Sequence, residues 1–203
     1  MNPLVPIAPI DPITPARRIL FETDRLILRR YEGADLDRLD RLNSDADVMR
    51  YIGDGSLRTR EQTQAGIVRA QRIYEMFPGL GLWIAEQKST RKFIGVFALI
   101  YIPDTVEVEV GYRLHRPYWG QGLATEGARA LVQYGFHTVG LDRIVGLTHA
   151  GNDASKRVLM KAGLTARGIG HYYGRDLCYF VTEKSNFSLP GSDTPLTTKT
   201  RRR

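Results

Sequence analysis

The sequence predicts a mixed α and β fold in a single domain. Segments that alternate apolar and polar residues, as strands do, are interleaved with segments whose apolar residues recur every three or four positions, as in amphipathic helices. The chain has 203 residues, of which 42% are hydrophobic and 25% charged, and these values suit one soluble globular domain with a sizeable core. Residues 106–126 are the most informative stretch, because a strand there runs through a glycine-rich turn directly into a helix.

The elements are expected in the following order: a strand at 25–31, helical segments at 35–43 and 45–51, a helix from 59 to about 77, strands at 82–87, 93–101 and 106–114, a helix from about 123, a strand at 144–148, a helix at 153–162, and a hairpin of 167–172 with 176–182. Thr59 is a good N-cap for the helix that it starts, and Pro78 with Gly79 ends that helix. The hairpin is expected to turn at Gly174. No internal repeat interrupts this order, so the sequence requires no second domain.

The turn at 119–125, WGQGLAT, has the features of an anion-binding device. Its glycines let the backbone approach a ligand closely, and the unpaired N–H groups of the first helical turn, aided by the helix dipole, favour a phosphate. A P-loop is absent, and a Rossmann fingerprint that starts at Gly120 fails at Thr125. The turn therefore indicates a ligand that carries a pyrophosphate, and the alternative is a glycine-rich turn that binds nothing.

This turn and two further segments resemble the GCN5-related N-acetyltransferase (GNAT) family. In that family a turn of the form Q/R-x-x-G-x-G/A holds the pyrophosphate of acetyl-CoA. Here Trp119 departs from the first position, whereas Gly122 and Ala124 match. The form P-x-W-G-x-G-x-A-T-E and the segment ETDRLILR at 22–29 are similar to the branch that acetylates ribosomal-protein N-termini. Residues 152–164, NDASKRVLMKAGL, resemble a third family motif, whose Asn contacts the pantetheine arm.

The resemblance covers about residues 22–185 and implies the α+β fold of the family, a central twisted mixed sheet of about six or seven strands flanked by about four helices. It predicts a GNAT domain at 19–185, between an irregular N-terminal extension at 1–18 and a basic tail at 186–203. It also implies acetyl-CoA as co-substrate and no metal. The cofactor-binding residues that it implies are Tyr112, Arg113, Leu114, Trp119, Gly120, Gln121, Gly122, Leu123, Ala124, Thr125, Asn152 and Ser155.

The implied reaction is attack of an amine on the thioester carbonyl of acetyl-CoA. Glu109 matches a position at which some family members use Glu as a base acting through water, and a Glu among buried strands would have its pKa raised toward neutrality. The alternative is that Glu107, Glu109 and Arg113, which share one strand face, form charge pairs. The family also implies that this strand is splayed from its neighbour, so that backbone N–H groups near Tyr112 stabilise the oxyanion.

The sequence identifies the general acid of this reaction less clearly than the general base. Many family members place a Tyr seven residues after the Asn, and here that residue is Leu159. Ser155, three residues after Asn152, is the available hydroxyl, and the resemblance to the ribosomal-protein branch implies that it lies near the CoA sulfur. The alternative for Ser155 is a local hydrogen bond at a helix start. The predicted catalytic residues are therefore Glu109 and Ser155.

Three functions remain open. The first is acetyl transfer to the α-amine of a protein or peptide. The second is N-acetylation of a small molecule, such as a polyamine, an antibiotic or an amino-acid-like amine. The third is a non-catalytic acyl-CoA-binding or ribosome-associated module. The acceptor wall is expected at 45–72 and 168–176, where arginines outnumber carboxylates, so an acidic acceptor or a partner surface fits this wall as well as a cationic amine does.

Charge and composition bear on partners and location. The formal net charge is +7, and nearly half of this excess follows Ser185, so a ribosome or RNA contact through the tail stands beside the alternative of a solvated tail. The four histidines lack metal-ligand spacing, and Cys178 is the single cysteine, which excludes an internal disulfide. Because the sequence has no apolar run of about 18 residues and no signal-peptide pattern, we expect a cytoplasmic protein without membrane contact, as a monomer or homodimer.

Overall fold

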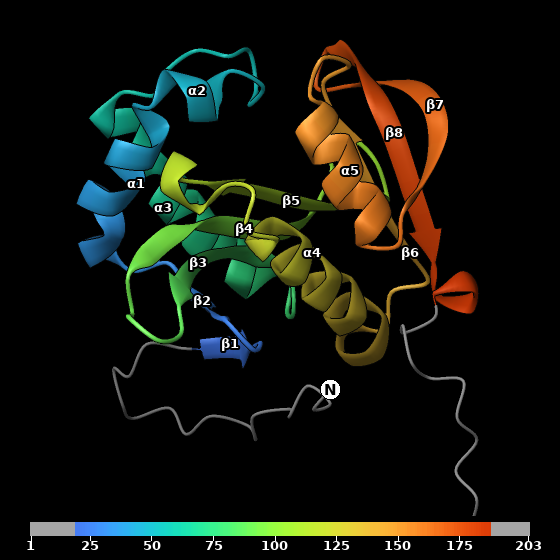
Figure 1. Cartoon of the computed structure of the whole chain (residues 1–203), viewed down its shortest axis with the longest axis horizontal. Helices are drawn as coiled ribbons and strands as arrows, with labels where there is room; N and C mark the ends of the chain where they lie inside the picture. Colours follow the sequence, from blue (N-terminus) through green and yellow to red (C-terminus); the bar gives the residue numbers. More distant parts are fainter. Residues whose placement is uncertain (1–18, 188–203) are drawn as a thin grey trace, which may run out of the picture.

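The computed structural model describes residues 19–187, which form one eight-stranded mixed sheet with helices on both faces (Figure 1). The strands are β1 (Ile19–Glu22), β2 (Leu26–Arg30), β3 (Gly81–Gln87), β4 (Phe93–Tyr101), β5 (Val108–Leu114), β6 (Arg143–Thr148), β7 (Thr165–Tyr172) and β8 (Arg175–Glu183), in the spatial order β1-β2-β3-β4-β5-β6-β8-β7. The α-helices are α1 (Leu36–Asn43), α2 (Ala46–Met49), α3 (Arg60–Met76), α4 (Leu123–Tyr134) and α5 (Asp153–Lys161). Shorter helical turns occur at Gly33–Asp35, Arg116–Tyr118, Gly135–Val139 and Lys184–Asn186.

The structure confirms the predicted fold class and the order of the elements, but it has more strands than the six or seven expected and one α-helix more than the four implied by the resemblance. Eight strands and five α-helices are present in the described range. The strand missed by the sequence is β1, which is only four residues long and too short to show alternation. It is held to β2 by a tight turn, in which the N–H of Thr23 donates to the C=O of Leu26 at 2.9 Å. The predicted extension at 1–18 and most of the predicted tail at 186–203 lie outside the described residues.

The strand that leads to the glycine-rich turn begins later than predicted. It starts at Val108, because the residues before it form a turn after β4, in which the N–H of Thr105 donates to the C=O of Ile102 at 3.2 Å. Val106, the first apolar residue of the predicted alternation, lies in this turn and is 91% exposed. The alternation in the sequence therefore extends two residues beyond the strand itself.

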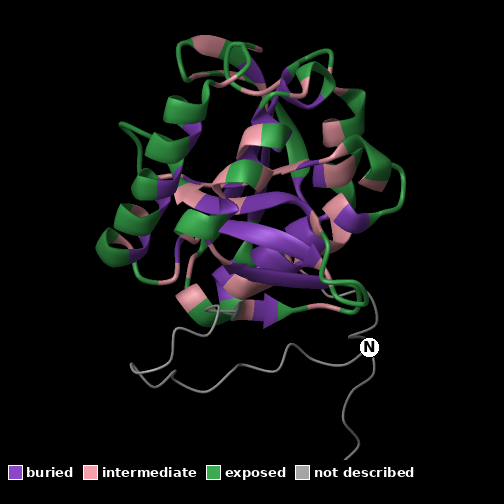
Figure 2. Cartoon of the chain, turned by 90° about the vertical axis from the view of Figure 1, so that its left-hand side faces the viewer, coloured by how far each residue is buried: buried purple, intermediate pink, exposed green. Residues whose placement is uncertain are grey.

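Each face of the sheet is covered by its own helices and has its own apolar core. On one face, α1, α2 and α3 pack residues such as Leu39 and Ile67 against Ile84 of β3. On the opposite face, α4 and α5 pack residues such as Leu131 against Phe97 of β4. Trp83, predicted as a core residue, is 2% exposed and belongs to this second core. Figure 2 shows buried strands enclosed by helices whose outer surfaces are exposed.

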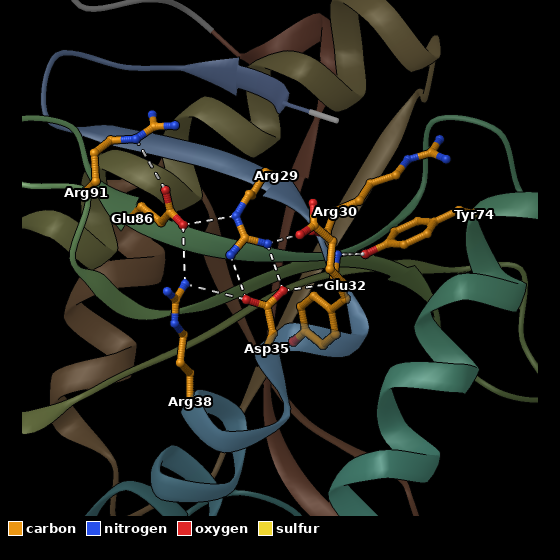
Figure 3. Close-up of polar contacts among 9 residues, drawn as sticks. Arg29, Arg30, Glu32, Asp35, Arg38, Tyr74, Glu86 and Arg91 are labelled. Atoms are coloured by element: carbon orange, nitrogen blue, oxygen red, sulfur yellow. Dashed lines mark hydrogen bonds and ion pairs between the residues drawn. The ribbon is translucent and has the colours of Figure 1, made fainter. Parts of the chain in front are cut away.

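A buried group of charged side chains fixes the start of α1 on the sheet (Figure 3). Arg29 is 1% exposed and donates from Nη1 and Nη2 to the carboxylate of Asp35, at 2.7 and 2.6 Å, and from Nε to Oε1 of Glu86 at 3.0 Å. Arg38 and Arg91 add longer ion pairs of 3.6 Å. Desolvation opposes the charged form of Asp35, but the hydrogen bonds from Arg29 outweigh it and hold the pKa of Asp35 below its ordinary value. The cluster thus anchors the segment that leads to α2.

The sheet opens between β5 and β6. These two strands run parallel, whereas every other strand pair of the described sheet is antiparallel. Their register is limited to Glu109 opposite Val145, whereas β5 pairs with β4 along its whole length. Beyond Glu109 the two strands diverge, as predicted for the splayed strand. The glycine-rich turn and α4 follow directly from the diverging end of β5, so this opening is where ligand-binding groups can converge.

Candidate functional site

A cavity of about 520 Å³ lies where β5 and β6 diverge. Its wall is formed by the end of α2, by β5 from Glu109 onward, by the glycine-rich turn and the start of α4, by the end of β6, and by α5. Two contacts join opposite sides of this region: Tyr51 stacks on the ring of His149 with 5.3 Å between centroids, and Nη1 of Arg175 donates to the C=O of Gly53. Segments from both halves of the sheet therefore meet around one cavity.

The glycine-rich turn supplies unpaired backbone donors to this cavity. Gly122 is the N-cap of α4 with φ of 76°, and Gly120 has φ of 73°, a left-handed conformation that other residues rarely adopt. The N–H of Glu126 donates to the C=O of Gly122 at 3.0 Å as the first bond of the helix, so the N–H groups of residues 123–125 have no partner within it. The dipole of this 12-residue helix adds positive potential at the same end. The arrangement suits the pyrophosphate indicated by the sequence.

The N-terminal motif at 22–29 folds directly onto this turn. Glu126 of α4 accepts hydrogen bonds from the hydroxyl of Thr23 at 2.5 Å, from the N–H of Arg25 at 2.9 Å and from Nε of Arg25 at 2.6 Å. Nη1 of Arg25 also donates to the C=O of Gln121 at 2.8 Å. The two motifs are therefore parts of one structural unit, which brings a cation beside the turn. This contact was not predicted from the sequence, although both partners lie in the motifs identified there.

Backbone donors of β5 also face the opening. The N–H of His115 bonds to the C=O of Ile94 at 2.9 Å, so the odd-numbered residues of this strand bond to β4. By the antiparallel alternation, the N–H groups of Tyr112 and Leu114 point away from β4 and toward the opening. The C=O of Leu114 points the same way, because it accepts from Nε1 of Trp119 at 2.7 Å. The N–H of Tyr112 therefore lies on the side of the strand where the sequence predicted an oxyanion donor.

Glu109 lines the cavity at the point where the strands diverge. Its Oε2 accepts a hydrogen bond from the hydroxyl of Tyr173 at 2.7 Å, and the N–H of Leu147 also donates to its carboxylate. Burial disfavours the charged form and raises the pKa of Glu109 to about 7, although both hydrogen bonds act in the opposite direction. A carboxyl group with this pKa can accept a proton near neutral pH, as the sequence prediction of a base requires.

The predicted alternative, charge pairs among Glu107, Glu109 and Arg113, is absent from the described residues. The carboxylate of Glu107 accepts from the hydroxyls of Tyr172 and Tyr179, both at 2.6 Å, and the two rings stack with 5.7 Å between centroids. These hydrogen bonds link the β7–β8 hairpin to the residue that precedes β5. Within residues 19–187, Arg113 forms no ion pair, and its buried Nε has no hydrogen-bond partner.

Asn152 and Ser155 mark the start of α5. Asn152 is the N-cap, and its Oδ1 accepts from the N–H of Ser155 at 3.1 Å. The hydroxyl of Tyr112 lies 3.0 Å from Oγ of Ser155 and donates to the C=O of Ser155 at 3.1 Å. Leu159, which occupies the position of the tyrosine expected from the family, is buried in the core. A tyrosine hydroxyl therefore reaches Ser155 from β5 instead of from α5, which sequence reasoning did not foresee.

The structure brings all but one of the predicted site residues to the cavity. Its wall includes Glu109, Tyr112, Arg113, Leu114, Trp119, Gly120, Gly122, Leu123, Ala124, Thr125, Asn152 and Ser155. Gln121 is the exception, because its exposed side chain turns back and donates from Nε2 to the C=O of Pro117 at 2.7 Å. The wall also includes residues that the sequence analysis had not assigned to cofactor binding, among them Arg50, Tyr51, Tyr118, Arg157 and Lys161. Arg157 and Lys161 are four residues apart on one helix, and this spacing could have predicted that they lie on the same face.

The remaining predictions concern the acceptor wall, metals and membranes. Of the predicted acceptor wall at 45–72, the residues that contribute to the cavity are Asp47, Val48, Arg50, Tyr51 and Ile52. Residues 168–176 form the end of β7, the turn and the start of β8, and within this range Tyr173 contacts the cavity wall through the hydrogen bond from its hydroxyl to Glu109. Within residues 19–187, no group of three or more His, Cys, Asp or Glu side chains is arranged to hold a metal ion. No helix in that range is long and apolar enough to cross a membrane.

Comparison with known proteins identifies the family. The sequence model of the acetyltransferase (GNAT) domain matches residues 25–165. YkkB of Bacillus subtilis is 37% identical over 145 residues, which are 70% of this chain and 83% of YkkB. The N-acetyltransferase YoaA of the same organism is 31% identical over 155 residues, 76% of this chain and 87% of YoaA. FsC-acetyl coenzyme A-N(2)-transacetylase of Aspergillus fumigatus is 31% identical over 133 residues, 62% of this chain and 56% of that protein.

Solved structures share the fold. The GNAT-family acetyltransferase from Bacillus anthracis superposes with a TM-score of 0.70 at 23% identity, over 81% of this chain and 98% of that chain. RimL, a ribosomal L7/L12 α-N-protein acetyltransferase solved with coenzyme A, has a TM-score of 0.67 at 18% identity, over 79% and 95%. AAC(6')-Ib, solved with ribostamycin and coenzyme A, has a TM-score of 0.71 at 20% identity, over 84% and 99%. With a family match that spans more than half of its length, this chain belongs to the GNAT family and is an acetyl-CoA-dependent N-acetyltransferase.

Proposed function

We propose that this GNAT enzyme transfers the acetyl group of acetyl-CoA to the α-amine of a protein or peptide, by direct attack in a ternary complex. The observation that carries the proposal is the pairing of two functions on β5. Glu109 offers a carboxyl group with a pKa of about 7, and the N–H of Tyr112, three residues further on, is directed toward the opening of the sheet. Both residues line the same cavity. A base and an oxyanion donor are thus held on one rigid element.

The residues around the turn fit acetyl-CoA, which when bound supplies an activated thioester and a pyrophosphate. The N–H groups of residues 123–125 and the dipole of α4 favour the pyrophosphate. Arg157 and Lys161 of the cavity wall add positive charge, and Arg25 lies beside the turn. Asn152 caps α5 through Oδ1, so its amide N–H groups remain available for the pantetheine arm. These features support binding of the predicted co-substrate by the predicted segment.

Glu109 is proposed to remove a proton from the acceptor ammonium. With a pKa of about 7 it is about half ionised at neutral pH, so a substantial fraction of the enzyme carries the base in its active form. Tyr173 stabilises the charged form by donating to Oε2 at 2.7 Å. The neutral amine then attacks the thioester carbonyl carbon, and the N–H of Tyr112 stabilises the negative charge that develops on the carbonyl oxygen.

Ser155 and Tyr112 are proposed to act together at the departing sulfur. Burial raises the pKa of the Tyr112 hydroxyl, although its hydrogen bond with Ser155 opposes this effect, so the phenol stays protonated at neutral pH. The two hydroxyls lie 3.0 Å apart on the cavity wall, and with the single phenol proton donated to Ser155, the hydroxyl of Ser155 is the one that can donate to the sulfur. Because a thiolate is already a good leaving group, hydrogen bonding to the sulfur suffices, and complete proton transfer from Tyr112 is not needed.

Two lines of support favour a protein or peptide acceptor. The segments at 22–29 and 117–126 are similar to the ribosomal-protein branch, and they pack together through Arg25 and Glu126. RimL and the ribosomal-protein-S5-alanine acetyltransferase of Vibrio fischeri share the fold, the latter with a TM-score of 0.67 at 17% identity, over 83% of this chain and 98% of that chain. Contact with the ribosome or RNA through the basic tail and a cytoplasmic location stay predictions.

The second candidate function is N-acetylation of a small molecule. It is favoured by the Aspergillus relative, which is 31% identical and is named for acetyl transfer at an N(2) position of FsC. The two candidates differ in the acceptor alone, since the cofactor segment and Glu109 serve either one. A panel of acceptors therefore separates them more directly than any substitution in the cofactor segment.

The experiment that tests the proposal combines binding with turnover. Isothermal titration with acetyl-CoA is followed by a free-thiol assay with pooled N-terminal peptides, polyamines and aminoglycosides. Micromolar binding with thiol release on the peptide pool is expected. Release on a small-molecule pool alone would replace the first candidate with the second. Binding without release on any pool would contradict the transferase proposal and favour a non-catalytic acyl-CoA-binding module.

A further inference from the structure

Arg113 is a charged residue of the cavity wall whose position is not explained by binding of the cofactor. Side chains alternate along β5, so Arg113 and Glu109 lie on the same face of the strand, opposite to Tyr112. Arg113 pairs with Val96 of β4, and Val96 belongs to the core formed with α1, α2 and α3. Its guanidinium therefore lies on the side of the sheet that carries α2, away from α4 and α5.

The guanidinium of Arg113 is half-buried and has no anionic partner among the described residues. Its Nε is inaccessible and has no hydrogen bond, and it forms no ion pair with any residue in the described range. Desolvation lowers its pKa, the buried hydroxyl of Tyr31 acts in the opposite direction, and repulsion from Arg58 makes a smaller contribution that also lowers it. A buried unpaired charge is costly to a fold, and proteins usually compensate it with a carboxylate. Here the group lines a cavity instead.

The carboxylates near this part of the cavity already have partners. Asp47, which lines the cavity, lies 2.5 Å from Nη1 of Arg116, and Asp54, outside the cavity wall, accepts from both the N–H and the hydroxyl of Ser56. Arg50, which also lines the cavity, lies over the ring of Tyr51 at 5.2 Å. The α2 side of the cavity thus carries positive charge that its own carboxylates do not balance. An additional negative group is needed there, and the acceptor is the ligand that enters from outside the cofactor segment.

We infer that the acceptor of this enzyme carries a carboxylate as well as the reacting amine, and that Arg113 binds this carboxylate. The inference rests on the proposed function, because it takes Glu109 as the point at which the amine reacts. Four residues of strand separate Glu109 from Arg113, a Cα separation of roughly 13 Å. An acidic side chain at the second or third position of an N-terminal peptide spans such a distance, and so does an ω-amino acid of similar length. Polycationic amines are disfavoured by the same charge.

The test compares matched acceptors that differ only in charge. The first pair is Ala-Ala-Glu amide and Ala-Ala-Gln amide, and the second pair is 8-aminooctanoate and 8-aminooctanamide. The measured quantity is kcat/KM for the acid divided by kcat/KM for the amide, by thiol release. We expect the wild-type ratio to be about tenfold or more for at least one pair, as expected for a charge-assisted bidentate contact. The pair that shows it distinguishes a peptide from a small molecule.

Substitution of Arg113 links this ratio to the proposed contact. Arg113→Gln should bring the ratio close to one, and Arg113→Lys should give an intermediate value because it keeps the charge without the planar fork. The matched control is Arg167→Gln, on the exposed strand β7, which should keep the wild-type ratio. A ratio that Arg113→Gln leaves at the wild-type value would overturn the assignment of Arg113.

A binding measurement on the wild-type protein tests the inference even if the Arg113 variants fail to fold. With the wild-type enzyme saturated with CoA, the Glu tripeptide should bind about tenfold more tightly than the Gln tripeptide. Equal binding and a ratio of one for both pairs would refute the acidic acceptor while leaving the transferase intact. No thiol release from any acceptor, despite acetyl-CoA binding, would instead refute the proposed function and this inference with it.

Discussion

Nε of Arg25 lies 2.6 Å from Oε2 of Glu126, which joins two segments that are a hundred residues apart in the sequence. The ion pair is half exposed at Arg25, so on its own it contributes little to the stability of the fold. Its effect is local: the remaining donors of the guanidinium lie at the glycine-rich turn, where Nη1 holds the C=O of Gln121. The pair therefore orders the turn and adds positive charge to it.

The contact of Arg25 with the turn predicts a specific effect on CoA affinity. Arg25→Gln should weaken CoA binding by roughly tenfold, because the turn loses both a cation and a hydrogen bond, while the melting temperature changes little. Titration calorimetry with CoA measures the effect. Lys88→Gln, which removes another exposed cation that pairs with Glu22 at 2.9 Å, is the control and should leave the affinity intact.

Gly122 tests the anion-binding turn itself. Gly122→Asp should abolish measurable CoA binding, because it places a carboxylate against the proposed pyrophosphate and strains a residue whose φ is 76°. Gly140→Asp is the matched control: Gly140 has φ of 83° at the end of the Gly135–Val139 turn and is not part of the cavity wall. Both variants should lose about 1 kcal/mol of stability. Equal CoA affinity in the two would disprove the role of the turn.

The pKa of Glu109 predicts the pH dependence of the reaction. A base with a pKa of about 7 should give a kcat/KM that rises with pH and levels off above this value. Glu109→Gln should remove this rising limb of the pH profile and lower kcat/KM by about 100-fold or more. Tyr173→Phe removes a hydrogen bond that favours the charged form, so the pKa rises and the limb moves to higher pH. Tyr172→Phe, whose hydroxyl bonds Glu107 instead, should leave the limb in place.

Ser155 and Tyr112 should behave as one unit in kinetics. Ser155→Ala and Tyr112→Phe should each lower kcat more than they weaken CoA binding, because the hydroxyls are proposed to act at the leaving sulfur. The double variant should be little worse than either single one, since the two hydroxyls lie 3.0 Å apart in one hydrogen-bonded chain. Strictly additive losses in the double-mutant cycle would show that they act separately.

The buried cluster around Arg29 predicts a large and pH-dependent contribution to stability. Arg29→Met should cost about 3 to 5 kcal/mol, because it leaves two carboxylates buried beside it, whereas Arg60→Met, at an exposed pair, should have little effect. The folded pKa of Asp35 is lowered, so its contribution is fully present above the unfolded value of about 3.9 and is lost as the pH falls below it. Urea unfolding between pH 7 and pH 2 measures both effects.

The parts of the fold and site that the sequence predicted are those encoded by neighbouring residues. The alternation that ends at Leu114, the glycines at 120 and 122, and the helix that starts at Asp153 each depend on local sequence, and all are present in the structure. Glu109 was selected by its place on the strand and its match to a family position, and the expected rise in its pKa follows from its burial among strands. These predictions required no knowledge of distant contacts.

The features that the sequence did not reveal depend on side chains brought together by packing. The hydroxyl of Tyr112 meets Ser155 across 43 residues, and Arg25 meets Glu126 across 101 residues. The missing partner of Arg113 is likewise a property of the folded surroundings, because the sequence places two glutamates on the same strand face. A period-2 pattern predicts on which face of the strand a side chain lies, but it does not predict which group the side chain contacts on that face.

The two-residue turn of the β7–β8 hairpin sets a limit on how this protein can be re-engineered. Tyr173 and Gly174 both have positive φ, of 54° and 72°, and join the opposed residues Tyr172 and Arg175, which is the geometry of a tight type I′ turn. Loop tips of this kind usually accept inserted peptides, tags or fused domains. Here one added residue would rotate Tyr173 away from Glu109 and shift Arg175 from Gly53. Fusion designs should therefore use the chain ends and leave the length of this hairpin unchanged.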